Sequence, residues 1–191
     1  GVQTCALPIL PDQAMVRRAL ERADFVIVQE AFEDTATARY ADLLLPAASW
    51  AEKEGTVTNS ERRISRVRAA VPAPGDARAD WQIAQAVGQR VEALRGISGP
   101  SLFAWTGPQD IWNEHRESTR GRDLDITGLD WARLEAAPQQ WPFLPGDEAG
   151  RVRLYADGRF PTPDGRARFS AAPWREAAET TSETLPLLLN T

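Results

Sequence analysis

Four residues stand where a bound ligand could use them. Gln29 and Glu30 end the apolar run FVIVQE, which we expect to be a buried strand. Lys53 is the only lysine among 22 basic residues and lies in WAEKEGT between two glutamates. Asp80 begins a predicted helix. A carboxylate can accept two hydrogen bonds from a purine edge or a ribose, and a lysine ammonium suits a phosphate or the O6 of guanine. The four residues are therefore candidates for a nucleotide site.

Each candidate also has a simpler interpretation. Glu30 could be a solvated loop acid, and Gln29 could merely fill the end of a strand. Lys53 could be a surface lysine held by its two acidic neighbours, although exposed pairs stabilise a fold by only about 0–1 kcal/mol. Asp80 could be the N-cap of its helix, a contribution of about 1 kcal/mol. An acid at a loop–helix junction can cap with one oxygen and bind with the other, so these alternatives stay open.

Other kinds of site have weaker support. One cysteine and one histidine cannot build a zinc site, an iron–sulfur site or a disulfide framework. Cys5 and His115 lie in no motif that would activate a nucleophile. The basic run ERRISRVR is more typical of a solvated strand face or a docking surface than of a nucleic-acid interface. We find no GxGxxG, P-loop or GxSxG motif.

Composition narrows the class of protein further. The chain has 191 residues, 42% of them hydrophobic, and seven tryptophans, which is enough for a packed core. Its net charge of −5 argues against general affinity for nucleic acid or an anionic membrane. No apolar run approaches the roughly 18 residues of a membrane span, and no secretory signal is visible. We therefore expect a cytoplasmic protein.

The first half of the chain is expected to form a parallel α/β sheet. We predict an amphipathic helix over residues 11–23 capped by Asp12, a strand over 25–29 buried on both faces, a short helix over 35–41 and a second strand over 43–45. In open sheets of this kind, ligands bind beyond the carboxyl ends of the strands, where Glu30 would lie. The predicted fold class is α/β, a partial Rossmann-like parallel sheet with helices, followed by an irregular α+β segment.

The sequence also predicts elements after residue 46. Residues 47–60 should be a loop hinged at Gly55, and residues 62–70 should be extended. Residues 80–94 should form a helix. The positions expected to share its apolar face are Ile83, Val87, Val91 and Leu94. Further predictions are helices over 108–119 and 130–137, hairpin strands over 151–155 and 166–170, and a strand over 185–189.

Taken together, these segments resemble the molybdopterin oxidoreductase family. The match covers about residues 20–95 and consists of a strand, an acid, TATARYADLLLPAASWAEKEGTVTNSERR and then APGDARADWQI. The later segments DIWNEHRESTRGRDLDITGL and PQQWPF look most like the catalytic subunit of bacterial assimilatory nitrate reductases. LYADGRFPTPDGRARF is similar to the segment that precedes the family's C-terminal β-barrel domain.

The resemblance implies a parent enzyme with a molybdenum bis(molybdopterin guanine dinucleotide) cofactor and an N-terminal [4Fe–4S] cluster, whose ligands lie outside this chain. Such an enzyme reduces nitrate to nitrite with an electron-donor protein or reductase subunit as partner. The family's cofactor contacts map onto Gln29, Glu30, Lys53 and Asp80. No residue of this chain is expected to be catalytic or to bind metal. Glu30 departs from the Asp common in periplasmic relatives, which changes its reach.

The same resemblance divides the chain. Residues 1–9, GVQTCALPI, look like the in-frame translation of a sequencing adapter and are excluded from fold inference. Residues 10–95 are expected to be part of the molybdopterin guanine dinucleotide-binding domain, and residues 96–178 a helical excursion and hairpin. Residues 179–191 would be a linker and the first strand of a truncated C-terminal β-barrel domain. A fragment cut at both ends is not expected to be active alone.

Two alternative functions remain at this point. A formate dehydrogenase α-subunit uses the same scaffold in the opposite redox direction. The large iron–sulfur subunit of respiratory complex I is a non-catalytic scaffold with this fold and no molybdenum. Retention of Glu30, Lys53 and Asp80 together disfavours the scaffold, because an empty site has no use for these three charges.

Overall fold

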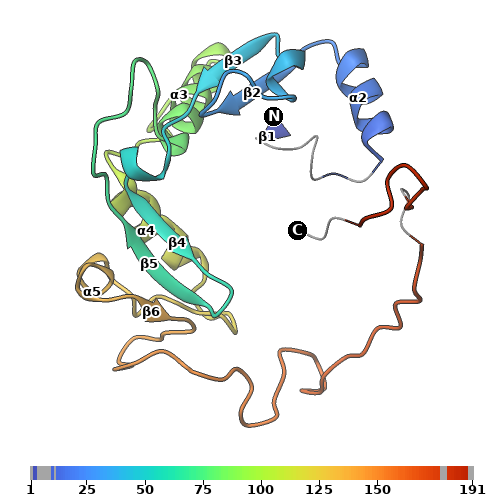
Figure 1. Cartoon of the computed structure of the whole chain (residues 1–191). Coiled ribbons are helices and arrows are strands. Elements are labelled where there is room, and N and C mark those ends of the chain that lie inside the picture. Colours follow the sequence, from blue (N-terminus) through green and yellow to red (C-terminus); the bar gives the residue numbers. More distant parts are fainter. Residues whose placement is uncertain (1, 4–9, 11, 177–179, 189–191) are drawn as a thin grey trace. The chain divides into compact units, whose positions relative to one another are not determined.

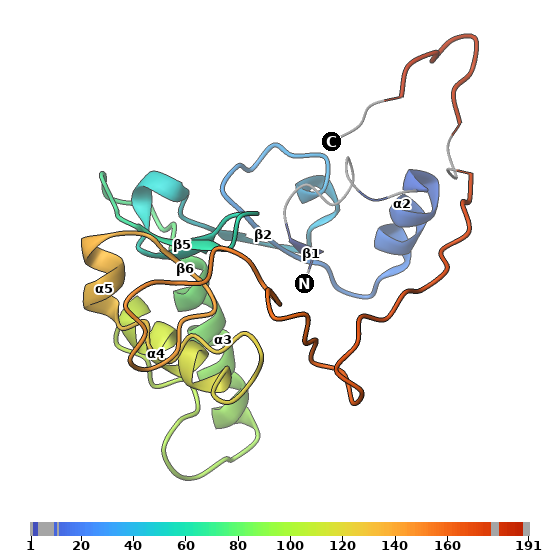
Figure 2. The same ribbon diagram turned by 90° about the horizontal axis from the view of Figure 1, so that it is seen from below.

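The computed structural model describes residues 2–3, 10, 12–176 and 180–188 (Figures 1 and 2). Two compact units form within the chain. One comprises residues 1–46 and 169–191, and the other comprises residues 47–168. The domain boundaries expected from the sequence differ from this division and stay a prediction.

The first unit contains a parallel sheet in the order β1 (Val2–Gln3), β2 (Ile27–Glu30) and β3 (Leu43–Pro46) (Figure 1). Ile27 pairs with Leu43 and Glu30 pairs with Pro46. The parallel pairing predicted for these two strands is confirmed. β1 lies within residues 1–9, and the adapter origin of that segment stays a prediction.

Burial along β2 alternates from residue to residue. Val26, Val28 and Glu30 are buried, whereas Phe25 and Ile27 are exposed. The prediction of a strand buried on both faces is therefore wrong, because the described part of the chain covers only one face of this strand. The alternation matters for the site because it places the Glu30 side chain on the buried face.

Short helices flank this sheet. α2 (Gln13–Arg22) is capped as predicted, since the carboxylate of Asp12 accepts a hydrogen bond from the Met15 N–H at 3.1 Å. The helix predicted over 35–41 is reduced to a single 3₁₀ turn, η1 (Ala38–Tyr40). The described part of the strand predicted over 185–189, residues 185–188, has no regular structure, and residue 189 lies outside the described residues.

The second unit is built on an antiparallel sheet of β4 (Gly55–Thr58), β5 (Arg63–Val67) and β6 (Gln139–Gln140). The extended segment predicted over 62–70 is confirmed as β5. The loop predicted over 47–60 is wrong, because it contains η2 (Trp50–Glu52) and β4. Gly55 is no hinge, since it pairs with Val67 in the β4–β5 hairpin.

α4 (Pro108–Ser118) and α5 (Trp131–Ala136) pack on this sheet, with α4 along one face (Figures 1 and 2). Both helices match their predicted ranges, and Asp130 caps α5 by accepting from the Arg133 N–H at 2.8 Å. The buried core of the unit consists of Ile64, Trp112, Ile126, Leu129, Leu134 and Phe143. This core fixes the sheet whose strand β4 begins two residues after Lys53.

α3 (Asp80–Leu94) is the longest helix described. Ile83 is buried as predicted, but Val87, Val91 and Leu94 are exposed, so the predicted apolar face is not a packed face in the described residues. Polar side chains of the helix make further contacts. The Gln85 amide donates to two backbone carbonyls of the following loop, at 2.8 and 2.6 Å.

The hairpin strands predicted over 151–155 and 166–170 are wrong. Those residues form turns and irregular backbone, and the glycines of the two turn signals, Gly158 and Gly165, do adopt positive φ. The Arg62 guanidinium donates to Arg151 O at 2.9 Å and to Val152 O at 2.8 Å. These two backbone carbonyl oxygens therefore accept from a side chain rather than from a partner strand. Within the described residues, no helix has the length and apolarity that crossing a bilayer requires.

Candidate functional site

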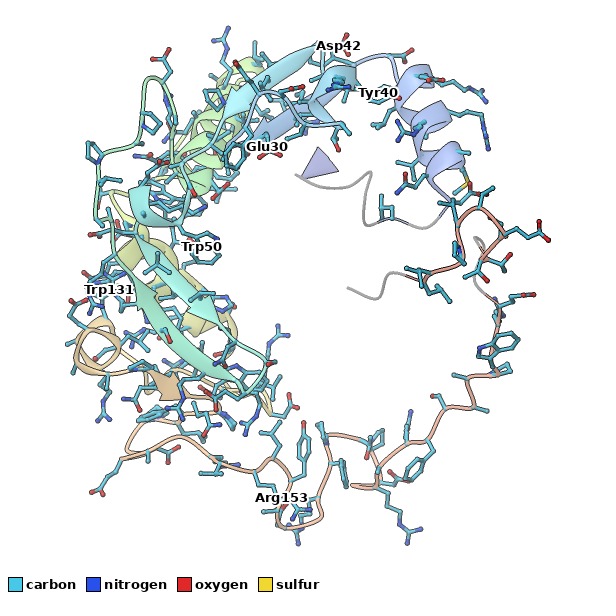
Figure 3. The ribbon with its side chains drawn as sticks, viewed as in Figure 1. Glu30, Tyr40, Asp42, Trp50, Trp131 and Arg153 are labelled. Atoms are coloured by element: carbon cyan, nitrogen blue, oxygen red, sulfur yellow. The ribbon has the colours of Figure 1, made fainter. Side chains whose placement is uncertain are left out.

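Glu30 is the last residue of β2 and is 3% exposed (Figure 3). Its Oε1 accepts hydrogen bonds from the backbone N–H groups of Ala31, at 2.7 Å, and Phe32, at 3.3 Å. Its Oε2 is buried and has no hydrogen-bond partner among the described residues. A buried acceptor without a partner carries a desolvation cost of about 1–3 kcal/mol, which a ligand's N–H would offset. The solvated-acid interpretation of Glu30 is therefore wrong.

The two oxygens of Glu30 have different roles. Because Oε1 already accepts twice from the turn, the carboxylate is held in one orientation. A purine edge with two adjacent N–H donors would then be received by the two lone pairs of Oε2 rather than by one lone pair on each oxygen. Gln29 precedes it on the strand, half-buried and paired with Leu45 of β3.

Lys53 follows η2 in an extended conformation, with φ −134° and ψ 162°. Its Nζ lies 2.5 Å from the Asp80 carboxylate and 5.8 Å from the centre of the Trp50 ring. The neighbouring acids are engaged elsewhere. Glu52 accepts from the Ser49 N–H at 2.8 Å, and Glu54 lies 3.8 Å from Arg66. The interpretation of Lys53 as a lysine held by its sequence neighbours is therefore wrong.

Asp80 occupies the first position of α3 rather than the cap. Ala79 is the N-cap residue, and its N–H donates to the Gln82 side chain at 3.0 Å. The prediction of Asp80 as the N-cap is thus wrong by one residue. The position still favours a negative charge, because the N-terminal end of a helix carries partial positive charge. The carboxylate also contacts the ammonium of Lys53.

Lys53 and Asp80 line a cavity of about 270 Å3. Its aromatic walls are Trp50 and Trp81, and Thr56 of β4 contributes to the lining. A second cavity of about 200 Å3 shares Thr56 and Trp81 and reaches His115 on α4. The arrangement offers a cation, an anion and two indole rings around one small space. Such a set suits a flat polar ring or a phosphorylated group.

The structure therefore brings together two of the four predicted site residues, Lys53 and Asp80. Gln29 and Glu30 lie in the other compact unit. Trp50 and Trp81 were not singled out by the sequence reasoning, although both stand inside the quoted motifs WAEKEG and DWQI. Their positions in the sequence could have indicated them, because Trp81 directly follows Asp80 and Trp50 lies three residues before Lys53.

Comparisons with known proteins decide the family. Residues 5–90 match the family described as Molybdopterin oxidoreductase. The chain belongs to this family. Three relatives illustrate the range. A nitrate reductase of Synechocystis sp. is 37% identical over 193 residues, covering 98% of this chain and 26% of the relative. A nitrate reductase of Klebsiella oxytoca is 40% identical over 192 residues, covering 95% of this chain and 21% of the relative.

The third relative has a different name. The F420-dependent formate dehydrogenase subunit alpha of Methanocaldococcus jannaschii is 36% identical over 181 residues, covering 95% of this chain and 25% of the relative. The fold is similar to that of acetylene hydratase from Pelobacter acetylenicus, with a TM-score of 0.53 at 20% identity, covering 82% of this chain and 19% of that one. This molybdopterin oxidoreductase chain thus spans about a quarter of the length of these curated relatives.

Membership of the family implies a molybdopterin cofactor. The residues present are compatible with part of one. In the part of the chain that the structure describes, the Oε2 of buried Glu30 is an acceptor without a donor, and the Lys53–Asp80 pair borders a cavity with aromatic walls. Among the described residues, no group of three or more His, Cys, Asp and Glu side chains could hold a metal ion.

Proposed function

We propose that this chain is part of a longer molybdenum-dependent nitrate reductase, the parent enzyme, and that it forms part of the binding site for molybdopterin guanine dinucleotide. One observation carries this proposal above the others. Glu30 is a buried acid at the carboxyl end of a parallel strand, where ligands of open α/β sheets bind, and one of its oxygens has no partner among the described residues.

The role proposed for Glu30 is recognition of guanine. Guanine presents adjacent N1–H and N2–H donors, which a single carboxylate group can accept. A charge-assisted hydrogen bond of this kind contributes about 1.5–3 kcal/mol. Gln29, next to it on β2, would contribute from its backbone or side chain. Adenine lacks this pair of donors, so Glu30 would also favour guanine over adenine.

The role proposed for Lys53 and Asp80 is to hold polar atoms of a bound molybdopterin guanine dinucleotide. The Lys53 ammonium would donate to a phosphate oxygen or to guanine O6, and Asp80 would accept from a ribose hydroxyl or a ring N–H. Each already fixes the other through their 2.5 Å contact, which reduces the side-chain entropy lost on binding. No catalytic step is assigned to either residue.

The chemistry belongs to the cofactor. When bound, the molybdenum cofactor supplies oxygen-atom transfer, in which nitrate takes up two electrons and two protons and becomes nitrite and water. The residues of this chain contribute binding and orientation only. A [4Fe–4S] cluster, an electron-donor protein or reductase subunit, and a cytoplasmic location complete the proposed parent enzyme.

We propose nitrate rather than formate as the substrate because the sequence of residues 110–143 looks most like that of assimilatory nitrate reductases. Relatives that support it include the assimilatory nitrate reductase catalytic subunit of Bacillus subtilis, 36% identical over 172 residues. A formate dehydrogenase is the second candidate, because such relatives are similar to a comparable degree.

The test is made on the parent enzyme purified with its cofactor. Glu30→Ala should lower both molybdenum and guanine nucleotide per polypeptide, measured by elemental analysis and by chromatography after acid release. Glu33→Ala is the matched control, because Glu33 is an exposed acid three residues further along. Equal contents in both variants would refute the site. If the unmodified enzyme oxidises formate and does not reduce nitrate, the proposed substrate is wrong and the enzyme is a formate dehydrogenase.

A further inference from the structure

Arg66 lies in the middle of β5, and its side chain is only 5% exposed. The guanidinium lies 3.7 Å from the centre of the Trp131 ring (Figure 3 labels Trp131). Its Nε donates to Glu135 at 3.0 Å. Hydrogen bonds from Arg68 and from Arg66 hold the pKa of Glu135 below its usual range. These contacts with α5 are sufficient to explain why a buried arginine is stable at this position.

Arg66 also contacts the segment that directly follows Lys53. Its Nη1 donates to the carbonyl oxygen of Gly55 at 2.7 Å, and its Nη2 lies 3.8 Å from the Glu54 carboxylate. Glu54 and Gly55 are the two residues directly after Lys53. An arginine with a purely local role in packing α5 on the sheet would not need either contact.

The segment is also fixed on the other side of Lys53. Glu52 and Ser49 close a cap, in which the Ser49 N–H donates to the Glu52 carboxylate at 2.8 Å. Lys53 is therefore the single residue between two anchored stretches, the cap of η2 and the pair held by Arg66. Its backbone direction, and hence the starting point of its side chain, depends on both anchors.

The contact with Glu54 has an electrostatic consequence as well. Glu54 carries a negative charge one residue from the ammonium, and it also lines the cavity of Lys53 and Asp80. With its carboxylate drawn toward Arg66, Lys53 is left to interact with Asp80 and with whatever enters the cavity. Preorganised groups of this kind lose less free energy on binding than groups that must reorient.

We propose that Arg66 is a positioning residue for the nucleotide site: it holds Glu54 and Gly55 so that the Lys53 ammonium faces Asp80 and the bound guanosine diphosphate group. The inference rests on the proposed function for its ligand, but the loop geometry it describes is independent of that ligand. Arg66 itself would not touch the nucleotide.

The test compares Arg66→Lys with Arg68→Lys in the full 191-residue chain. Lysine retains the charge but cannot form the fork of hydrogen bonds that joins Gly55 to α5. Arg68 shares the Glu135 partner, at 2.9 Å, but among the described residues it makes no hydrogen bond or ion pair with Glu54 or Gly55. It therefore controls for loss of the Glu135 network.

Two measurements are made at a temperature at which all variants are folded. The first is the dissociation constant for guanosine diphosphate, which should rise about tenfold in Arg66→Lys and stay within twofold in Arg68→Lys. The second is the set of backbone amide chemical shifts of Lys53, Glu54 and Gly55, which should move in Arg66→Lys only. A purely structural arginine would lower the unfolding temperature without changing either quantity in the folded protein.

The outcomes separate the two claims. If guanosine diphosphate binds and Arg66→Lys binds it as tightly as the unmodified chain, the positioning role is wrong and the proposed function stands. Should the unmodified chain fail to bind it, the proposed site is weakened, and the amide shifts alone decide the role of Arg66. Unchanged shifts in Arg66→Lys, or equal shifts in Arg68→Lys, overturn the inference.

Discussion

Replacement of Lys53 by methionine removes the ammonium and shortens the side chain by only one atom. Two contacts are lost from the protein itself. The ion pair with Asp80 joins side chains that are 24% and 44% exposed, so it contributes about 0–1 kcal/mol to stability. The contact with the Trp50 ring at 5.8 Å adds about 0.5–1 kcal/mol. The free energy of unfolding should thus fall by about 1 kcal/mol, a shift of about 2–4 °C in a protein of this size.

The effect on the cofactor should be larger. Within the described residues Asp80 is the hydrogen-bond acceptor of Lys53, which leaves donors of the ammonium available to a ligand. A lost charge-assisted hydrogen bond of about 1.5–3 kcal/mol corresponds to a roughly 10- to 150-fold weaker complex. Lys53→Met should therefore lower the molybdenum content of the parent enzyme, whereas Lys53→Arg should restore most of it.

The assay measures molybdenum per polypeptide together with the KM for nitrate of the enzyme that remains loaded. Arg63→Met is the control, because it breaks an exposed ion pair with Glu61 at 3.1 Å on the adjacent hairpin. The KM should be unchanged, since Lys53 holds the cofactor rather than the substrate. Normal molybdenum content in Lys53→Met, or an equal loss in Arg63→Met, would refute the reasoning.

Two further predictions concern the stability of the second unit. Gly128→Ala should lower the unfolding temperature by about 3–10 °C, because the added Cβ would overlap the carbonyl oxygen of Leu144 and overpacking costs about 1–3 kcal/mol. Gly55→Ala, with open space at its Cβ, should not lower the unfolding temperature in a calorimetric scan. Burial opposes the ionisation of Asp125, but hydrogen bonds from the hydroxyl and N–H of Thr127 outweigh it and lower the pKa of the carboxyl group. A carboxyl group whose pKa is lowered in the folded state stabilises the fold at pH values above the ordinary pKa of Asp. This stabilisation is lost as the pH falls through the pKa of the folded state. The unfolding temperature of Asp125→Asn should thus depend less steeply on pH below about 4 than that of the unmodified chain, and parallel curves would contradict this.

Local patterns predicted the elements whose determinants lie close together in sequence. The Asp12 cap, the parallel pair of strands ending at Glu30 and Pro46, and the two helices around the core all depend on neighbouring residues. The predictions of an apolar face on α3 and of two hairpin strands were wrong for another reason. Apolar spacing shows that Val87 can face a core, but not whether a core is there, and a turn signal does not specify a partner strand.

The site shows the same limit. Lys53 stands out in the composition and Glu30 by its place after an apolar run, so both could be proposed from sequence. The partner of Lys53 could not be deduced, because Asp80 is 27 residues away and two acids stand beside the lysine. Arg66 was hidden in a basic run that reads as a solvated face, although its side chain is buried. Only tertiary packing distinguishes it from its neighbours.

The central claim is that Glu30 in one unit, and Lys53 with Asp80 in the other, each bind the molybdopterin guanine dinucleotide cofactor of the parent enzyme. The most direct measurement is an experimental structure of the parent enzyme with its cofactor bound. We predict that Glu30 Oε2 accepts from a guanine edge within hydrogen-bonding distance, about 2.7–3.2 Å, and that Lys53 donates to a polar atom of the bound cofactor. A guanine whose N1–H and N2–H groups are bound by other residues, with Glu30 Oε2 paired to protein, would contradict it.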